Sequence, residues 1–122
     1  MLNVLIIEDE PVIGLLLRHL LAEMGHVCVG VEGTEAGAVA AAARLRPTLL
    51  LVDSKLRQGT GGGALRQILA TGFVPHILMS GDSQAAATPA EPAKVRMRKP
   101  FTDRDLERAV AQATGVSSAA RA

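Results

Sequence analysis

Aromatic residues and cysteine are scarce in this sequence. Of its 122 residues only 2% are aromatic, with two phenylalanines and neither tyrosine nor tryptophan. Because 48% of the residues are hydrophobic, aliphatic side chains must build the core of what is, by its length, a single domain. The one cysteine, Cys28, excludes a disulfide framework and a multi-cysteine zinc site. We expect it to be a small apolar core residue.

An excess of one charge and long apolar runs are also missing. Thirteen basic residues stand against twelve acidic ones, which gives no case for nucleic-acid binding. No apolar run approaches the roughly 18–20 residues that span a bilayer, and no leader-like segment opens the chain. We therefore expect a small soluble protein of the cytoplasm, with neither nucleic acid nor a membrane as its partner.

Short apolar runs alternate with amphipathic segments along the chain. The runs predict strands at 2–7, 27–31, 49–52 and 76–80, and the charged segment 94–98 predicts a fifth strand at the edge of the sheet. The amphipathic segments predict helices at 11–24, 34–45, 64–70 and 102–114. Between 81 and 93 the pattern is weaker, because Pro89 and Pro92 would cut a helix short. The alternation predicts an α/β fold, a doubly wound parallel sheet with helices on both faces, in either a Rossmann-like or a flavodoxin-like strand order.

Polar residues follow the predicted strands at their carboxyl ends, where ligands bind in such sheets. Glu8 and Asp9 follow the first strand, Asp53 ends the third, Ser80 ends the fourth and Lys99 follows the fifth. Carboxylates crowded in one cleft favour a Mg²⁺ ion. A metal, an ammonium and a hydroxyl around one carboxylate are suited to stabilising a phosphoryl group. Asp53 would then be the nucleophile that forms an acyl phosphate.

These residues lie in motifs that resemble one known family. The sequence is similar to the receiver domain of bacterial two-component response regulators, the CheY-like fold, from Val4 to about Thr114. The matching motifs are Ile6-Ile7-Glu8-Asp9-Glu10-Pro11, Leu51-Val52-Asp53, Met79-Ser80-Gly81 and Lys99-Pro100-Phe101. The resemblance implies a flavodoxin-like five-stranded sheet of order 2-1-3-4-5, with a fourth helix that is shortened or irregular here.

The resemblance also implies what the site binds. Asp53 would accept a phosphoryl group from a sensor histidine kinase or a histidine phosphotransfer protein. Asp9 would ligate Mg²⁺ directly and Glu8 through water. Asp53 would also belong to the metal site, and the carbonyl group of Lys55 would complete the protein ligands.

In this family the modification changes a distant surface. Ser80 and Lys99 would contact the phosphoryl oxygens and couple them to the face formed by the fourth helix, the fifth strand and the last helix. We expect a downstream protein to bind that face.

Four positions depart from the family pattern or modulate it. Arg96 stands where the family usually has an aromatic switch residue, and Arg57 stands where a proline is common. We expect Arg96 to stay outside and contribute to partner recognition, although a solvated edge charge is an equal alternative. Lys55 and Asp82 flank the site and could pair across its mouth.

A glycine-rich segment follows the third strand. Residues 59–64 fit the dinucleotide pattern G-x-G-x-x-A, with Asp82 about 20 residues further on. The first glycine stands too far from the strand end for a pyrophosphate turn, so we interpret the segment as a flexible loop.

Taken together, the residues favour a stand-alone phosphoacceptor and not an enzyme. Only 21 residues follow Phe101, so we expect a receiver domain at 1–116, a flexible tail at 117–122, and a monomer or weak dimer that acts by protein contact. One alternative is a receiver-fold scaffold that acts without phosphorylation. Another, an enzyme that binds a nucleotide or flavin, lacks an aromatic residue to stack the ring.

Overall fold

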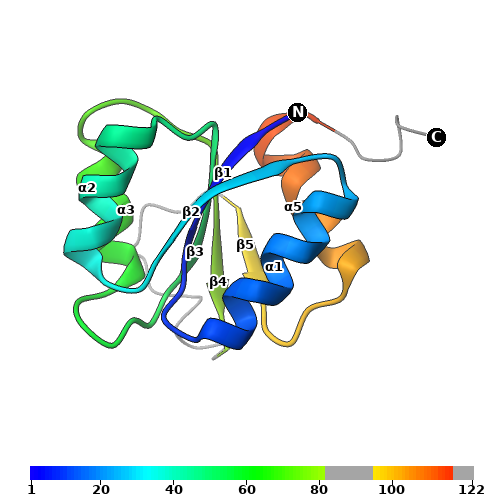
Figure 1. The fold of residues 1–122 in the computed structure, drawn as a ribbon, viewed down its shortest axis with the longest axis horizontal. Helices are drawn as coiled ribbons and strands as arrows, with labels where there is room; N and C mark the ends of the chain where they lie inside the picture. The colour runs from blue at the N-terminus through cyan, green and yellow to red at the C-terminus, as the bar shows by residue number, and fades with distance from the viewer. Residues whose placement is uncertain (82–94, 117–122) are drawn as a thin grey trace.

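In the described part of the chain, a parallel sheet lies between two pairs of helices (Figure 1). The computed structural model describes residues 1–81 and 95–116. Along the chain the elements are β1 (Asn3–Ile7), α1 (Pro11–Glu23), β2 (Val27–Glu32), α2 (Glu35–Leu45), β3 (Leu49–Asp53), α3 (Gly61–Leu69), β4 (His76–Ser80), β5 (Arg96–Arg98) and α5 (Asp103–Thr114). The expected fourth helix, with Pro89 and Pro92, falls outside the described residues.

All neighbouring strands of the sheet are parallel. The spatial order is β2-β1-β3-β4-β5, which confirms the flavodoxin-like order that the family resemblance implied. Every residue of β3 and of β4 is buried, as expected for central strands that are covered on both faces. Parallel pairing brings the carboxyl ends of β1, β3, β4 and β5 to one edge of the sheet, and this edge carries the candidate site.

The apolar core is divided by the sheet into two halves. Helices α1 and α5 cover one face and α2 and α3 the other (Figure 1). Leu17 and Leu106 pack with Leu51 in the first half, and Ala41 and Leu65 pack in the second. Aliphatic side chains fill both halves, as the scarcity of aromatic residues predicted.

Helix α3 begins three residues earlier than the sequence indicated. The interpretation of the glycine-rich segment as a flexible loop is wrong for Gly61–Gly63, which form its first turn. The Thr60 hydroxyl accepts a hydrogen bond from the Gly63 N–H at 2.9 Å and caps the helix. Glycine is required at position 61, because a Cβ atom there would collide with the Asp53 carbonyl oxygen. The close approach of helix to strand therefore overrides the low helix propensity of glycine.

The two edge strands of the described sheet differ in length and character. Strand β2 has six residues, and its Val27 and Val31 side chains are exposed. Its register with β1 is irregular between Val4 and Leu5. Strand β5 has three residues, two of them arginines. Because β2 is an edge strand, Cys28 is only partly buried and packs against the core from its margin.

Within residues 1–81 and 95–116, no helix has the length and apolar character that crossing a membrane requires.

Candidate phosphoacceptor site

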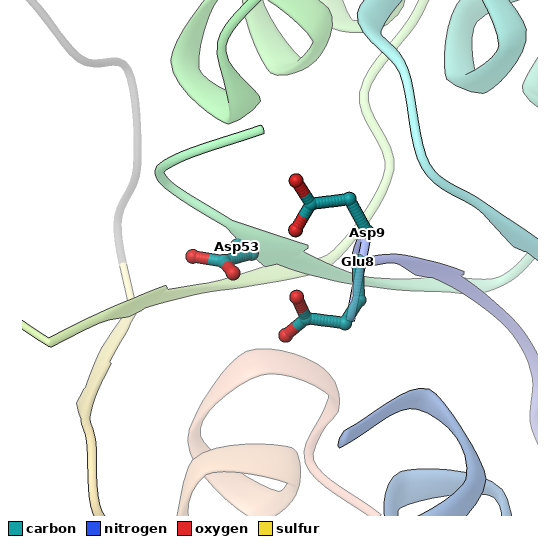
Figure 2. Close-up of side chains that lie close together, drawn as sticks. All are labelled: Glu8, Asp9 and Asp53. Atoms are coloured by element: carbon teal, nitrogen blue, oxygen red, sulfur yellow. The ribbon is translucent and has the colours of Figure 1, made fainter. Parts of the chain in front are cut away.

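Three carboxylates meet at the carboxyl edge of the sheet. Glu8 and Asp9 follow the last residue of β1, and Asp53 is the last residue of β3. Figure 2 shows the side chains of Glu8 and Asp9 both reaching toward Asp53, Glu8 on the side of α1 and α5 and Asp9 on the side of α2 and α3. One ligand atom from each of the three lies within 4.8 Å of the others. The alternation of side chains after β1 thus places an acid on each side of Asp53.

Lys99 joins two of these acids. Its Nζ atom lies 2.9 Å from Asp53 Oδ2 and 3.1 Å from Glu8 Oε1. The side chain of Glu8 is fully buried and that of Lys99 is 22% exposed, so water screens these ion pairs weakly. The Lys99 backbone N–H donates to the Ser80 carbonyl at 2.8 Å, which fixes the point where the lysine side chain enters the site.

The crowding of negative charge appears in the pKa values. Burial, together with the neighbouring Asp53, raises the pKa of Glu8 from 4.5 to about 7. Burial alone would lower the pKa of Lys99, but its contacts with Asp53 and Glu8 outweigh burial and raise it. The single positive charge of Lys99 therefore does not neutralise the negative charge of the three carboxylates. A set of hard oxygen donors with excess negative charge fits Mg²⁺.

Backbone N–H groups hold the carboxylates in place. The Lys55 N–H donates to Asp53 Oδ1 at 3.2 Å, and the Glu10 N–H donates to Glu8 Oε2 at 3.2 Å. The opposite oxygen of Asp53 accepts from Lys99, so both oxygens of Asp53 are oriented. The backbone just after β3 is also held in place, because the Ser54 N–H donates a hydrogen bond to the Met79 carbonyl at 2.8 Å.

The site opens to solvent through a pocket beside Asp53. Its lining consists of Asp9, Glu10, Asp53, Ser54, Lys55, Leu56, Arg57, Gly81 and Lys99. Lys55 and Arg57 are exposed at its mouth, and Ser80 is buried at the end of β4. Asp82, and with it the expected pairing of Asp82 with Lys55, lies outside the described residues.

Arg96 is on a different surface from the pocket. It is half-buried on β5, paired in register with Leu78 of β4. With Arg98, Asp105 and Arg108 it lines a second shallow pocket between β5 and α5. The structure thus places Arg96 on the face where we expected a partner, and its role there stays a prediction.

One residue beside the site was missed by the sequence reasoning. Glu35, the first residue of α2, accepts hydrogen bonds from residues of the loop that follows Asp53 and from α3. Its only local signal was its place directly after the helix cap Thr34. Nothing in the sequence connects it to residues 25 or more positions away.

Known proteins share both the sequence and the fold. No protein-family model matches the chain. The phyllosphere-induced regulator PhyR of Methylorubrum extorquens is 34% identical over 122 residues, which are 98% of this chain and 46% of that protein. The PhyR receiver domain of Erythrobacter litoralis, solved by NMR, is 32% identical with a TM-score of 0.86, over 95% of this chain and 92% of that one. The receiver domain of the sensor histidine kinase PA1611 of Pseudomonas aeruginosa has a TM-score of 0.83 at 24% identity, over 94% of this chain and 98% of that one.

The fold and these similarities define a class of regulatory domain. The chain belongs to the family of response regulator receiver domains. It resembles the receiver domain of PhyR in particular, and it spans about half the length of the PhyR protein that it matches. We therefore classify it as a regulatory receiver domain.

Proposed function

We propose that this chain is a phosphoacceptor response regulator of a two-component or phosphorelay system, with residues 1–116 as its receiver domain. The observation that carries the proposal is the position of Asp53. Its carboxylate is paired with Lys99, flanked by Glu8 and Asp9, and accessible from the pocket. A receiver domain site with these groups is suited to taking a phosphoryl group from a phosphohistidine donor.

In the proposed reaction an Asp53 oxygen attacks the phosphorus atom. The phosphorus–nitrogen bond of phosphohistidine breaks, its electron pair stays on the imidazole nitrogen, and an acyl phosphate forms on Asp53. Lys99, which contacts Asp53 in the unmodified protein, would hold a phosphoryl oxygen. The Ser80 hydroxyl would donate to another oxygen from the end of β4.

A Mg²⁺ ion fits the acidic side of this site. Asp9, Asp53, Glu8 and the Lys55 carbonyl would hold it, since they supply the oxygen donors that the ion prefers. When bound, it would neutralise negative charge on the transferring phosphoryl group. A solved structure of the PA1611 receiver domain has a magnesium ion coordinated in its active-site cleft, which supports this assignment.

The phosphorylated state would act by protein contact. We propose that the partner binds the face that includes β5 and α5, where Arg96 and Arg98 lie beside Asp105 and Arg108. Lys55 and Arg57, at the mouth of the pocket, would modulate access to Asp53 and the lifetime of the modification.

The test is phosphoryl uptake with a matched control. The chain is incubated with Mg²⁺ and a small phosphodonor, and separately with a phosphorylated histidine phosphotransfer protein, and its intact mass is measured. We expect a gain of one phosphoryl group that Asp53→Asn abolishes. Asp103→Asn, which removes an exposed carboxylate at the start of α5, should leave uptake unchanged. No uptake from either donor would overturn the proposal and favour a scaffold that acts without phosphorylation.

A further inference from the structure

We infer that Glu35 is a positioning residue for the phosphoacceptor site. It would act by latching the loop that joins β3 to α3. This inference rests on the proposed function, because the loop carries the Lys55 peptide that contacts Asp53 and would hold the metal. Glu35 itself is the first residue of α2.

Both oxygens of the Glu35 carboxylate are engaged by residues that follow Asp53. Oε1 accepts a hydrogen bond from the Thr60 N–H at 2.9 Å, and Oε2 accepts one from Gln67 Nε2 at 2.6 Å. The Glu35 backbone N–H donates to the Gln58 carbonyl at 3.1 Å. A parallel bridge between Thr34 and Gln58 extends this contact. Several hydrogen bonds therefore hold the start of α2 against the end of the loop.

Further contacts connect Thr60 to Asp53. Thr60 forms an antiparallel bridge with Lys55, and the Gly61 N–H donates to the Ser54 carbonyl at 3.1 Å. These contacts close residues 55–60 into a compact loop. Lys55 then presents its N–H to Asp53 Oδ1. Glu35 thus connects to the phosphoacceptor through Thr60 and Lys55, with no direct contact needed.

The glycines of this segment make room for the Glu35 side chain. Gly59 has a φ of +81°, and a Cβ atom there would collide with Glu35 Cβ. A Cβ atom at Gly63 would lie 2.6 Å from Glu35 Oε1, closer than real contacts allow. Of the two glycines in the dinucleotide-like pattern, Gly59 makes room for the Glu35 side chain, whereas Gly61 makes room for the Asp53 carbonyl group.

The experiment compares Glu35→Ala and Glu35→Gln with the wild type. Glu23→Ala, which removes an exposed carboxylate from the end of α1, is the control. Hydrogen exchange of the Lys55 amide should be about tenfold faster in Glu35→Ala, while the core amides of β3 keep their protection. The Mg²⁺ concentration that half-saturates phosphoryl uptake should rise about fivefold, and the uptake rate at saturating Mg²⁺ should change little. Glu35→Gln keeps an oxygen for the Thr60 N–H and should restore most of both values.

Two results would overturn the inference. One is Lys55 exchange in Glu35→Ala that equals exchange in Glu23→Ala, and the other is equal acceleration at Lys55 and in β3, which would mean a loss of global stability only. If Glu35→Ala does not fold, Gly63→Ala displaces the same carboxylate and should give the same Lys55 result. If the wild type takes up no phosphoryl group, the proposed function fails, and the exchange measurement still decides whether the latch exists.

Discussion

Replacing Lys99 by methionine tests whether one ammonium group stabilises the buried acids. Its Nζ contacts Glu8 and Asp53 at 3.1 and 2.9 Å. At an effective dielectric constant of about 20, each contact amounts to roughly 5 kcal/mol before desolvation is subtracted. Removing one partner of a buried ion pair costs about 3–5 kcal/mol in net terms. Because Lys99 is partly solvated, we expect Lys99→Met to lower the free energy of unfolding by about 3 kcal/mol near pH 8 without Mg²⁺.

The loss should depend on pH with a defined sign. The pKa of Glu8 is about 7 in the folded protein, against an ordinary value of 4.5. Between these values the folded state binds more protons than the unfolded state, so this group makes stability fall as pH rises. Contact with Lys99 lowers the pKa of Glu8. Without the lysine, the pKa rises further and the fall extends above pH 7. The cost of the substitution should therefore be smaller near pH 5 than near pH 8.

Urea unfolding at both pH values measures this difference directly. Lys55→Met is the matched control, because Lys55 is exposed at the pocket mouth and its loss should cost less than about 0.5 kcal/mol. Adding Mg²⁺ should return more stability to Lys99→Met than to the wild type, because a cation then balances the uncompensated carboxylates. A cost for Lys99→Met that is equal at both pH values, or no larger than for Lys55→Met, would refute the reasoning.

Two further predictions concern the cap of α5 and the core packing of β3. The pKa of Asp105 is lowered by its hydrogen bonds with the Thr102 backbone and side chain in the capping box of α5, so its contribution to stability should be present at neutral pH and be lost as pH falls through the folded-state pKa. Asp105→Asn should flatten the acid limb of a stability-against-pH curve, and an unchanged limb would contradict this. Leu51→Ala, at a fully buried position, should cost about 2–5 kcal/mol in denaturant unfolding, whereas Leu15→Ala on the exposed side of α1 should stay within about 0.5 kcal/mol. Similar costs for the two leucines would argue against the described packing of β3.

Most of the sheet could be predicted from the sequence because its signals are local. Each apolar run ends at a charged or polar residue, and a parallel sheet brings those ends to one edge whatever the strand order. The sequence therefore predicts that Glu8, Asp53 and Lys99 lie together. Strand order itself came from the family resemblance and not from periodicity.

The errors arose where distant contacts override local preference. Three successive glycines disfavour a helix, yet Gly61–Gly63 form the first turn of α3 because the helix packs closely on β3. Cys28 looked like a core residue because its neighbours are apolar, but β2 is at the edge of the sheet and buries it only in part. Glu35 carried no sign of its contact with Thr60, because that contact depends on how α2 and α3 pack together.

The unequal edges of the sheet have a consequence for self-association. An incoming strand from another molecule pairs most readily with a long, apolar edge that lacks charge. Strand β2 offers six residues with exposed Val27 and Val31, whereas β5 offers three residues with two arginines. The irregular register beside Leu5 interrupts the ladder on the inner side of β2. We expect intermolecular pairing in concentrated or partly unfolded samples to begin at β2, and a lysine in place of Val31 to suppress it without disturbing the phosphoacceptor edge.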